Sequence, residues 1–359
     1  MTSHYDISII LPVYNVSPFL TRCLDSLLEQ RCQNMEIIAV NDGSTDNSPE
    51  ILERYRSRFT ALRIIHQENK GLSEARNRAL SVATGKYIYC VDSDDYIAPK
   101  CVETIVSEME RHQLDTLFFA THLESPMEPT SLKATANYFQ RPRSVINKTL
   151  DAQSFFNMCI AERAKNGQGY SVVVWGYAWR RELYSGLLFQ TRYYEDEYFT
   201  TALLLSCPQA KVRCIADRLY HHLLRSGSIT SSTGQVKRTL AILDTFRLLL
   251  PLAGNTTDKK TLQSLSLYVD MLYLDAFTQQ LGQVVTVFSA QKMIRFLVTN
   301  LHDLYIKNKT ENGLVIMLQI VEKIVRDAEL VNEKEALETL QRIRRAIDTK
   351  RELALLISS

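Results

Sequence analysis

Two acidic residues directly follow a short apolar segment in the first third of the chain. Residues 87–91 read Tyr-Ile-Tyr-Cys-Val, and Asp92-Ser93-Asp94 comes next. The apolar segment predicts a buried strand whose end holds both carboxylates close together, where they need a counter-charge. Mg²⁺ or Mn²⁺ would supply that charge, because both cations prefer oxygen ligands. A solvated turn that caps a helix near Pro99 explains the same triplet, and for the triplet taken alone it is the favoured interpretation.

A second polar loop, Asn41-Asp42-Gly43-Ser44-Thr45-Asp46, also follows an apolar segment. Asp, Ser and Asn are typical of turns and of helix N-caps, and a helix is expected to begin near Pro49. A carboxylate at a strand end also accepts hydrogen bonds from the N–H and O–H groups of a base or a ribose. For Asp42 the structural and the binding interpretations are compatible.

A third loop opens a helix and carries a basic residue. In residues 69–77, Gly71 is expected in the turn, Ser73 as the cap and Arg76 one turn inside the helix. Helix N-termini and arginine both suit phosphate groups. An arginine on a helix surface is, by itself, more often simply solvated.

The elements around these loops alternate between strands and helices. Apolar segments at 7–13, 36–41, 62–66 and 87–91 are separated by segments with helical spacing at 19–30, 49–59 and 73–82. This order predicts an α/β fold in which a mostly parallel sheet is covered by helices and binds ligands at the carboxyl ends of its strands. The three loops, together with Tyr14-Asn15 after the first strand, are therefore expected at one edge of the sheet.

The C-terminal part of the chain has a different pattern. Apolar residues recur at helical spacing in five segments: Gln235–Pro251, Lys260–Gln280, Ala290–Ile306, Asn312–Arg326 and Glu333–Ile357. We expect residues 1–232 to form the catalytic domain, with a nucleotide-binding half at 1–100 and an acceptor half at 101–232, and 233–359 to form a helical domain. The last helix has an apolar stripe bordered by basic residues. It would either lie on an anionic membrane surface or pack on neighbouring helices or on a second subunit of a homodimer.

Composition excludes some functions. Lys and Arg total 42 against 40 for Asp and Glu, which gives no electrostatic case for binding nucleic acid. The seven cysteines are scattered without a close pair, which favours a reducing, cytoplasmic setting. No signal sequence and no apolar stretch long enough to cross a bilayer is recognised, so we expect any membrane contact to be peripheral, on the inner face of the cell membrane.

Taken in order, four motifs resemble those of family 2 glycosyltransferases: Pro12-Val13-Tyr14-Asn15, the loop 41–46, residues 71–77 and Asp92-Ser93-Asp94. The resemblance covers residues 7 to about 230 and implies the nucleotide-binding GT-A fold with a UDP-sugar as donor. It implies that the donor is bound by Pro12, Tyr14, Asn15, Asp42, Gly71, Arg76, Asp92 and Ser93. Among these, Pro12, Tyr14 and Asp42 would contact the uridine and Arg76 the base or phosphates. Asp92 would bind the ribose and, with Asp94, the Mn²⁺ or Mg²⁺ ion.

The resemblance continues at the acidic pair Glu195-Asp196, which lies on the acceptor side in the family. Asp196 is the candidate general base, because inversion requires a carboxylate to take the proton of the attacking hydroxyl. The alternative is that both acids only favour a helix N-terminus. Upstream, Trp175 either stacks on the acceptor sugar or belongs to the core, and the sequence gives these two interpretations equal weight.

The segment 220–230 resembles the family's tyrosine-rich stretch that ends in Arg-x-Gly-Ser-Ile. Arg225 and Ser228 would close over the diphosphate. Relatives often carry Arg at the position of Leu223 and Tyr at those of His221 or His222, so this chain departs from the pattern here. His222 is a candidate metal ligand or, more commonly for such a histidine, a structural residue.

The resulting hypothesis is a metal-dependent inverting glycosyltransferase. It would move a sugar from a UDP-sugar to a hydroxyl of a glycan or lipid-linked saccharide in the synthesis of lipopolysaccharide, capsule or exopolysaccharide. One alternative, a sugar nucleotidyltransferase, would need a glycine-rich basic loop where this chain has Pro12 to Asn15. The other, a non-catalytic binding or scaffolding protein, does not explain why Asp92, Asp94 and Asp196 occur together.

Overall fold

The computed structural model describes residues 5–32, 34–124, 139–166, 169–190, 194–224, 245, 248–269 and 271–272. The chain divides into two compact units, Met1–Ser232 and Thr233–Ser359. All candidate site residues that the structure describes belong to the first unit.

The first four long strands of this unit run in parallel in the order β3-β2-β1-β4. They are β1 (Ile7–Val13), β2 (Met35–Asp42), β3 (Leu62–Gln67) and β4 (Tyr87–Cys90). Every residue of β1, β2 and β4 is buried, as expected for strands that are covered on both faces. The predicted strands and their parallel pairing are confirmed for this half of the sheet.

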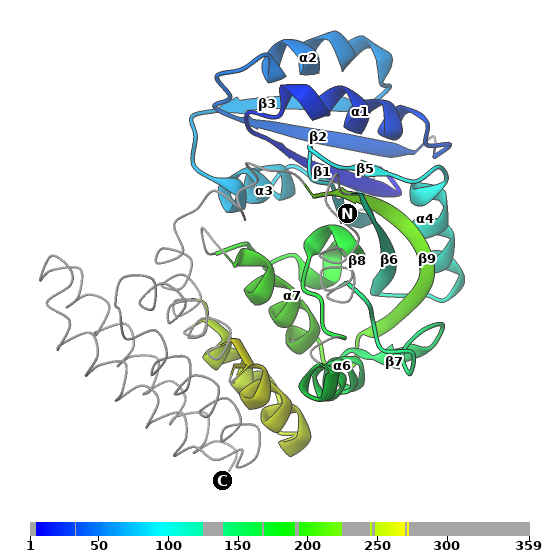
Figure 1. The fold of residues 1–359 in the computed structure, drawn as a ribbon, viewed down its shortest axis with the longest axis vertical. Helices are drawn as coiled ribbons and strands as arrows, with labels where there is room; N and C mark the ends of the chain where they lie inside the picture. Colours follow the sequence, from blue (N-terminus) through cyan, green and yellow to red (C-terminus); the bar gives the residue numbers. More distant parts are fainter. Residues whose placement is uncertain are drawn as a thin grey trace, which may run out of the picture. The chain divides into compact units, whose positions relative to one another are not determined.

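Helices cover the two faces of these strands (Figure 1). They are α1 (Ser17–Leu28), α2 (Ser48–Tyr55), followed by the short η1 (Arg56–Arg58), and α3 (Leu72–Leu80). Alternate residues of β1, from Ile7 to Val13, share a hydrophobic cluster with apolar residues of α1 and α2. Helix α3 contacts β1 and β2, and Figure 1 shows it on the opposite side of the sheet from α1 and α2. The strand period of two thus places alternate side chains under different helices.

The sheet then continues through β8, β6, β9 and β5, with β7 beside β9. These elements are β5 (Tyr96–Ile97), α4 (Cys101–Arg111), β6 (Thr116–Glu124), β7 (Thr149–Asp151), α6 (Ala152–Asn166), η2 (Val174–Gly176), β8 (Tyr177–Arg180), η3 (Glu182–Tyr184), α7 (Glu195–Ser206) and β9 (Lys211–Leu223). Strand β8 is antiparallel to both β4 and β6, and β5 is antiparallel to β9, whereas β6 and β9 are parallel. The parallel character predicted for the sheet therefore belongs to its N-terminal half, and the other half is mixed.

Helix α7 is buried over most of its length, from Tyr198 to Leu205. The ring of Phe199 stacks on Phe189 with ring centroids 4.0 Å apart and lies 5.3 Å from the ring of Trp179. Because α7 is apolar on nearly all sides, its position is set by packing. This packing fixes the position of the helix N-terminus and therefore of Glu195 and Asp196, the first two residues of α7.

In the second unit the structure describes η4 (Leu250–Asn255) and a helical segment at 259–269. The carboxylate of Asp258 accepts hydrogen bonds from the backbone N–H and the hydroxyl of Thr261 and so caps this segment. The segment falls within the helix predicted over 260–280, and the helices predicted after residue 280 lie outside the described residues. Within the part of the chain that is described, no helix is both long and apolar enough to cross a membrane.

Candidate active site

The loops after β1 and β2 are joined by side-chain hydrogen bonds. The side-chain oxygen of Asn15 accepts a hydrogen bond of 2.8 Å from the backbone N–H of Thr45. The Asn15 N–H in turn donates to the hydroxyl of Ser44. Asn15 has φ +50°, a left-handed conformation that asparagine tolerates better than most residues. These contacts hold Tyr14, which is 47% exposed, at the carboxyl end of β1, whereas Pro12 is buried within the strand.

Asp42 organises the loop that leads into α3. Its Oδ1 accepts hydrogen bonds from the side chain of Gln67 and from the N–H of Lys70, and its Oδ2 accepts one of 2.8 Å from the N–H of Gly71. Asp42 is 3% exposed, and its hydrogen bonds give it a structural role that was not predicted, because they join the end of β2 to the loop before α3. A carboxylate has further acceptor capacity, and the contact with uridine stays a prediction.

Two glycines shape the same place. Gly71 has φ +93°, which side chains rarely adopt, and it directly precedes α3. Gly43 has φ +70°, and a Cβ there would lie 2.8 Å from the backbone nitrogen of Asn69. The loop after β2 and the loop before α3 therefore approach each other as closely as their backbones allow.

Asp92 to Asp95 form a turn between β4 and β5, closed by a hydrogen bond of 3.1 Å from the N–H of Asp95 to the carbonyl of Asp92. Burial alternates along it: Asp92 and Asp94 are half-buried, whereas Ser93 and Asp95 are buried. The predicted strand end that holds carboxylates is thus present. The two half-buried carboxylates offer the hard oxygen ligands that suit Mg²⁺ or Mn²⁺.

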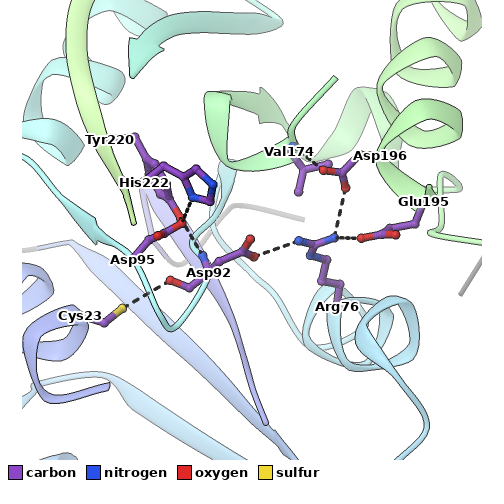
Figure 2. A network of polar contacts seen from close by, with 9 residues as sticks. All are labelled: Cys23, Arg76, Asp92, Asp95, Val174, Glu195, Asp196, Tyr220 and His222. Atoms are coloured by element: carbon purple, nitrogen blue, oxygen red, sulfur yellow. Dashed lines mark hydrogen bonds and ion pairs between the residues drawn. The ribbon is translucent and has the colours of Figure 1, made fainter. Parts of the chain in front are cut away.

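Arg76 joins this turn to Glu195 and Asp196 (Figure 2). Its Nη2 donates to Asp92 at 2.9 Å, and its Nη1 donates to Glu195 at 2.8 Å and to Asp196 at 3.2 Å. The side chain is 1% exposed, and its Nε has no hydrogen-bond partner among the residues that the structure describes. Arg76 was expected to contact the base or phosphates, but its terminal nitrogens already bind carboxylates. Burial favours this arrangement, because a buried guanidinium needs counter-charges.

The local charge balance is negative, since three carboxylates meet one guanidinium. Burial and the neighbouring Glu195 raise the pKa of Asp196 well above its usual range. Burial also raises the pKa of Glu195, although Arg76 opposes that shift. A divalent cation near Asp92 and Asp94 would offset part of the excess negative charge, so the donor set fits the predicted Mn²⁺ or Mg²⁺.

Asp95 fixes the end of β9 beside the turn (Figure 2). Its Oδ2 accepts hydrogen bonds from the hydroxyl of Tyr220 at 2.7 Å and from Nδ1 of His222 at 2.8 Å, and its Oδ1 accepts one from the N–H of Leu223. With Nδ1 occupied in this way, the Nε2 of His222 is the ring nitrogen that suits a metal. A carboxylate that orients a histidine is a common feature of metal sites.

Trp175 belongs to the core rather than to a sugar-binding surface. It is 4% exposed and stacks on the ring of Tyr220 at 4.4 Å and of His222 at 5.0 Å between centroids. The expected acceptor role of Trp175 is not supported, because almost none of its surface is left for a sugar. The preceding residue, Val174, donates its backbone N–H to Asp196 at 3.3 Å.

The structure brings together residues that are far apart in the sequence, including Arg76, Asp92, Glu195, Asp196 and His222. Arg225 and Ser228 lie outside the described residues. Sequence reasoning missed Asp95 and Tyr220 as part of this arrangement. In the structure, burial distinguishes Asp95 from Asp94: Asp95 is buried and Asp94 is half-buried. Successive side chains after a buried strand point in different directions, and that alternation is the signal that could have separated the two residues.

Comparisons with known proteins agree with this geometry. A protein-family model described as glycosyl transferase family 2 matches residues 8–165. The uncharacterized glycosyltransferase EpsJ of Bacillus subtilis is 35% identical over 230 residues, and the match covers 62% of this chain and 62% of EpsJ, less than two thirds of that relative. The glycosyltransferase GlyG of Streptococcus pneumoniae is 30% identical over 244 residues, which cover 67% of this chain and 78% of GlyG.

A solved structure is similar over nearly the whole chain. The crystal structure of S. aureus TarS 1–349 in complex with UDP-GlcNAc has a TM-score of 0.57 at 21% identity, and the match covers 96% of this chain and 89% of that one. This similarity establishes the fold and confirms the predicted GT-A architecture.

Proposed function

Because the chain belongs to glycosyltransferase family 2, we propose that it transfers a sugar from a UDP-sugar to an acceptor hydroxyl with inversion, in a reaction that depends on a divalent metal. The observation that carries this proposal is the contact of Arg76 with Asp92 on one side and with Glu195 and Asp196 on the other. One side chain thereby links the turn expected to hold the donor with the pair expected to face the acceptor.

The donor would bind at the carboxyl ends of β1, β2 and β4. Tyr14 is exposed there, and the N-terminus of α3 offers backbone N–H groups of the kind that bind phosphate. TarS has been crystallised with UDP-GlcNAc, which makes UDP-sugars the first donor class to test. Arg225 and Ser228 would close over the diphosphate from the segment that follows β9.

Asp94, with Asp92 and Nε2 of His222, would hold Mn²⁺ or Mg²⁺. The bound metal would act as a Lewis acid that neutralises the charge of the leaving diphosphate. Asp95 supports this role of His222, because its hydrogen bond to Nδ1 fixes the ring and leaves Nε2 available.

Asp196 would act as the general base. It would take the proton of the acceptor hydroxyl as that oxygen bonds to the anomeric carbon and the bond from this carbon to the diphosphate oxygen breaks. Its raised pKa supports this role, since a base is most effective when its pKa approaches the working pH. Glu195 would tune this pKa through its charge, and Arg76 would keep both acids in place.

We propose a glycan or a lipid-linked saccharide in cell-surface polysaccharide synthesis as the acceptor, met on the inner face of the cell membrane by a cytoplasmic enzyme. This acceptor class comes from the family resemblance alone. The helical part after residue 233 would form a separate domain that contacts the membrane, a second subunit or the catalytic domain.

The proposal is tested by measuring UDP release from a panel of UDP-sugars with and without Mn²⁺, on the wild type and on Asp94→Ala. We expect at least one donor to be hydrolysed in a Mn²⁺-dependent manner and Asp94→Ala to lose this dependence. Mn²⁺-dependent turnover that Asp94→Ala retains at the wild-type level would show that the assignment of Asp94 is wrong, and equal turnover of the wild type with and without metal would show that the reaction does not depend on a metal.

A further inference from the structure

Two histidines and a glutamate lie together outside the site described above. His122 and Glu124 are on β6, and His221 is on β9. One ligand atom from each of the three side chains lies within 4.8 Å of the others. The mechanism proposed above uses none of these residues.

Strand geometry explains why these residues meet. His122 and Glu124 are two positions apart on β6 and therefore point to the same face. His122 is the direct neighbour of His221 in the parallel pairing of β6 and β9, and their ring centroids are 5.1 Å apart. His222, next along β9, points to the opposite face and binds Asp95, so the cluster is separate from the proposed donor site.

His221 has a buried ring nitrogen without a hydrogen bond among the described residues. Its Nδ1 is inaccessible to solvent and has no hydrogen-bond partner. The nearest carboxylate oxygen, Oε1 of Glu124, lies 3.5 Å away, which is longer than a normal hydrogen bond. A buried nitrogen of this kind is costly unless it gains a partner, and a metal ion between His221 and Glu124 would provide one.

Other side chains orient the glutamate as outer-shell groups orient a metal ligand. The hydroxyl of Tyr96 donates to Oε1 of Glu124, and Nη1 of Arg22 contacts Oε2 at 3.3 Å. The ring of Tyr96 also stacks on His221 with centroids 4.3 Å apart. Such supporting contacts fix the direction of a ligand's lone pairs. The positive charge of Arg22 lies on the Oε2 side, away from the oxygen that faces His221.

We propose that His122, Glu124 and His221 form a separate metal site that takes a borderline-soft transition ion, Zn²⁺ in particular. Two imidazoles and one carboxylate match the ligand set of many zinc sites, whereas carboxylate and water oxygens are the ligands that best suit Mg²⁺ and Mn²⁺. Because His122 is exposed, a water molecule completes the coordination. The ion ties β6 to β9 next to β5, the strand that follows the Asp92–Asp95 turn.

The test is a titration of the metal-free, full-length protein with Zn²⁺ by calorimetry, and with Co²⁺ by visible absorption, which reports the ligand geometry. The variants are His122→Ala and Glu124→Gln, of which the first removes an exposed side chain and leaves the core intact. Loss of an outer-shell partner weakens metal binding roughly 10- to 100-fold. Loss of a ligand in either variant should weaken Zn²⁺ binding by at least as much. We also expect Zn²⁺ to raise the melting temperature of the wild type more than that of His122→Ala.

Two controls separate this site from others. His112→Ala removes another histidine that lies 3.6 Å from a glutamate, Glu108, and Asp94→Ala disrupts the proposed donor site. Both controls should retain the Zn²⁺ affinity and the Co²⁺ spectrum of the wild type, whatever the outcome of the donor assays. Affinity that is unchanged in His122→Ala and Glu124→Gln, or that is lost in Asp94→Ala, would overturn the proposal.

Discussion

Nη1 of Arg76 lies 3.2 Å from Oδ1 of Asp196, although 120 positions separate the two residues in the chain. The same guanidinium binds Asp92, which begins the turn after β4, and Glu195, which begins α7. One buried cation therefore joins α3, the turn after β4 and the start of α7. Removing that cation would leave buried carboxylates without compensation.

Replacing Arg76 by Met should lower the free energy of unfolding by about 3–5 kcal/mol, the usual cost of breaking a buried ion pair. Chemical denaturation measures this loss. Arg58→Met is the matched control, since Arg58 is 52% exposed in its ion pair with Asp25. Its replacement should lower the free energy of unfolding by about 1 kcal/mol or less. Similar losses in the two variants would contradict the role given to Arg76.

The pH dependence of turnover should report the raised pKa of Asp196. Burial first, and Glu195 second, favour the protonated form of Asp196. A base is inactive when protonated, so activity should fall with decreasing pH through a pKa that lies above the ordinary value of about 3.9 for Asp. Glu195→Gln removes the neighbouring charge and should move this acid limb to lower pH. The pH dependence of kcat in the wild type and in Glu195→Gln measures the direction of this shift. An acid limb that stays in place or moves to higher pH in Glu195→Gln would contradict the prediction.

Asp95→Asn should weaken both the fold and the proposed metal site. Three donors converge on this carboxylate. The amide of an asparagine would turn its own N–H₂ donor toward one of them, and the lost hydrogen bond should lower the free energy of unfolding by about 1–3 kcal/mol. Release of His222 should weaken Mn²⁺ binding roughly 10- to 100-fold. Denaturation and metal titration measure the two effects.

Asp25→Asn serves as the control for this variant. Asp25 accepts a hydrogen bond of 2.7 Å from the hydroxyl of Tyr55 but is about half exposed, so its neutralisation should leave metal affinity unchanged. Mn²⁺ affinity that is equal in Asp95→Asn and in the wild type would show that Asp95 does not position a ligand.

Gly71→Ala should destabilise the chain through backbone strain alone. An added Cβ would meet nothing within 4 Å, but φ is +93° and ψ is 166°, a backbone region that is essentially restricted to glycine and costs other residues about 1–3 kcal/mol. Gly186→Ala is the control, because Gly186 also has open space and no such φ. Denaturation of both variants should show a loss for Gly71→Ala only, and equal stability would contradict the argument.

The sequence predicted the N-terminal half of the fold well because its strands are continuous apolar runs between helices with clear periodicity. It did not predict the antiparallel insertion of β8 between β4 and β6. That pairing depends on contacts between distant segments, which local patterns do not record. The buried α7 likewise has no amphipathic pattern to mark its orientation.

For the candidate site, residue types indicated which loops carry polar and charged side chains, but not the partners of those side chains. Arg76 was expected to face the donor because arginine commonly binds phosphate, yet its burial among three carboxylates depends on where α7 packs. Trp175 was left undecided between sugar binding and the core, and the stacking on Tyr220 could not be derived from the segment itself. Asp95 is buried and accepts three hydrogen bonds, whereas Asp94 is half-buried, and two adjacent residues of the same type carry no sign of this difference.

The central claim is that Asp196 removes the acceptor proton and does not bind the donor. The direct measurement compares UDP-sugar affinity, by calorimetry with Mn²⁺, and turnover for the wild type and Asp196→Asn. We expect donor affinity to change little, whereas turnover falls roughly 100-fold or more, as for loss of a general base. Turnover close to that of the wild type, or a loss of donor affinity that accounts for the whole effect, would contradict the account.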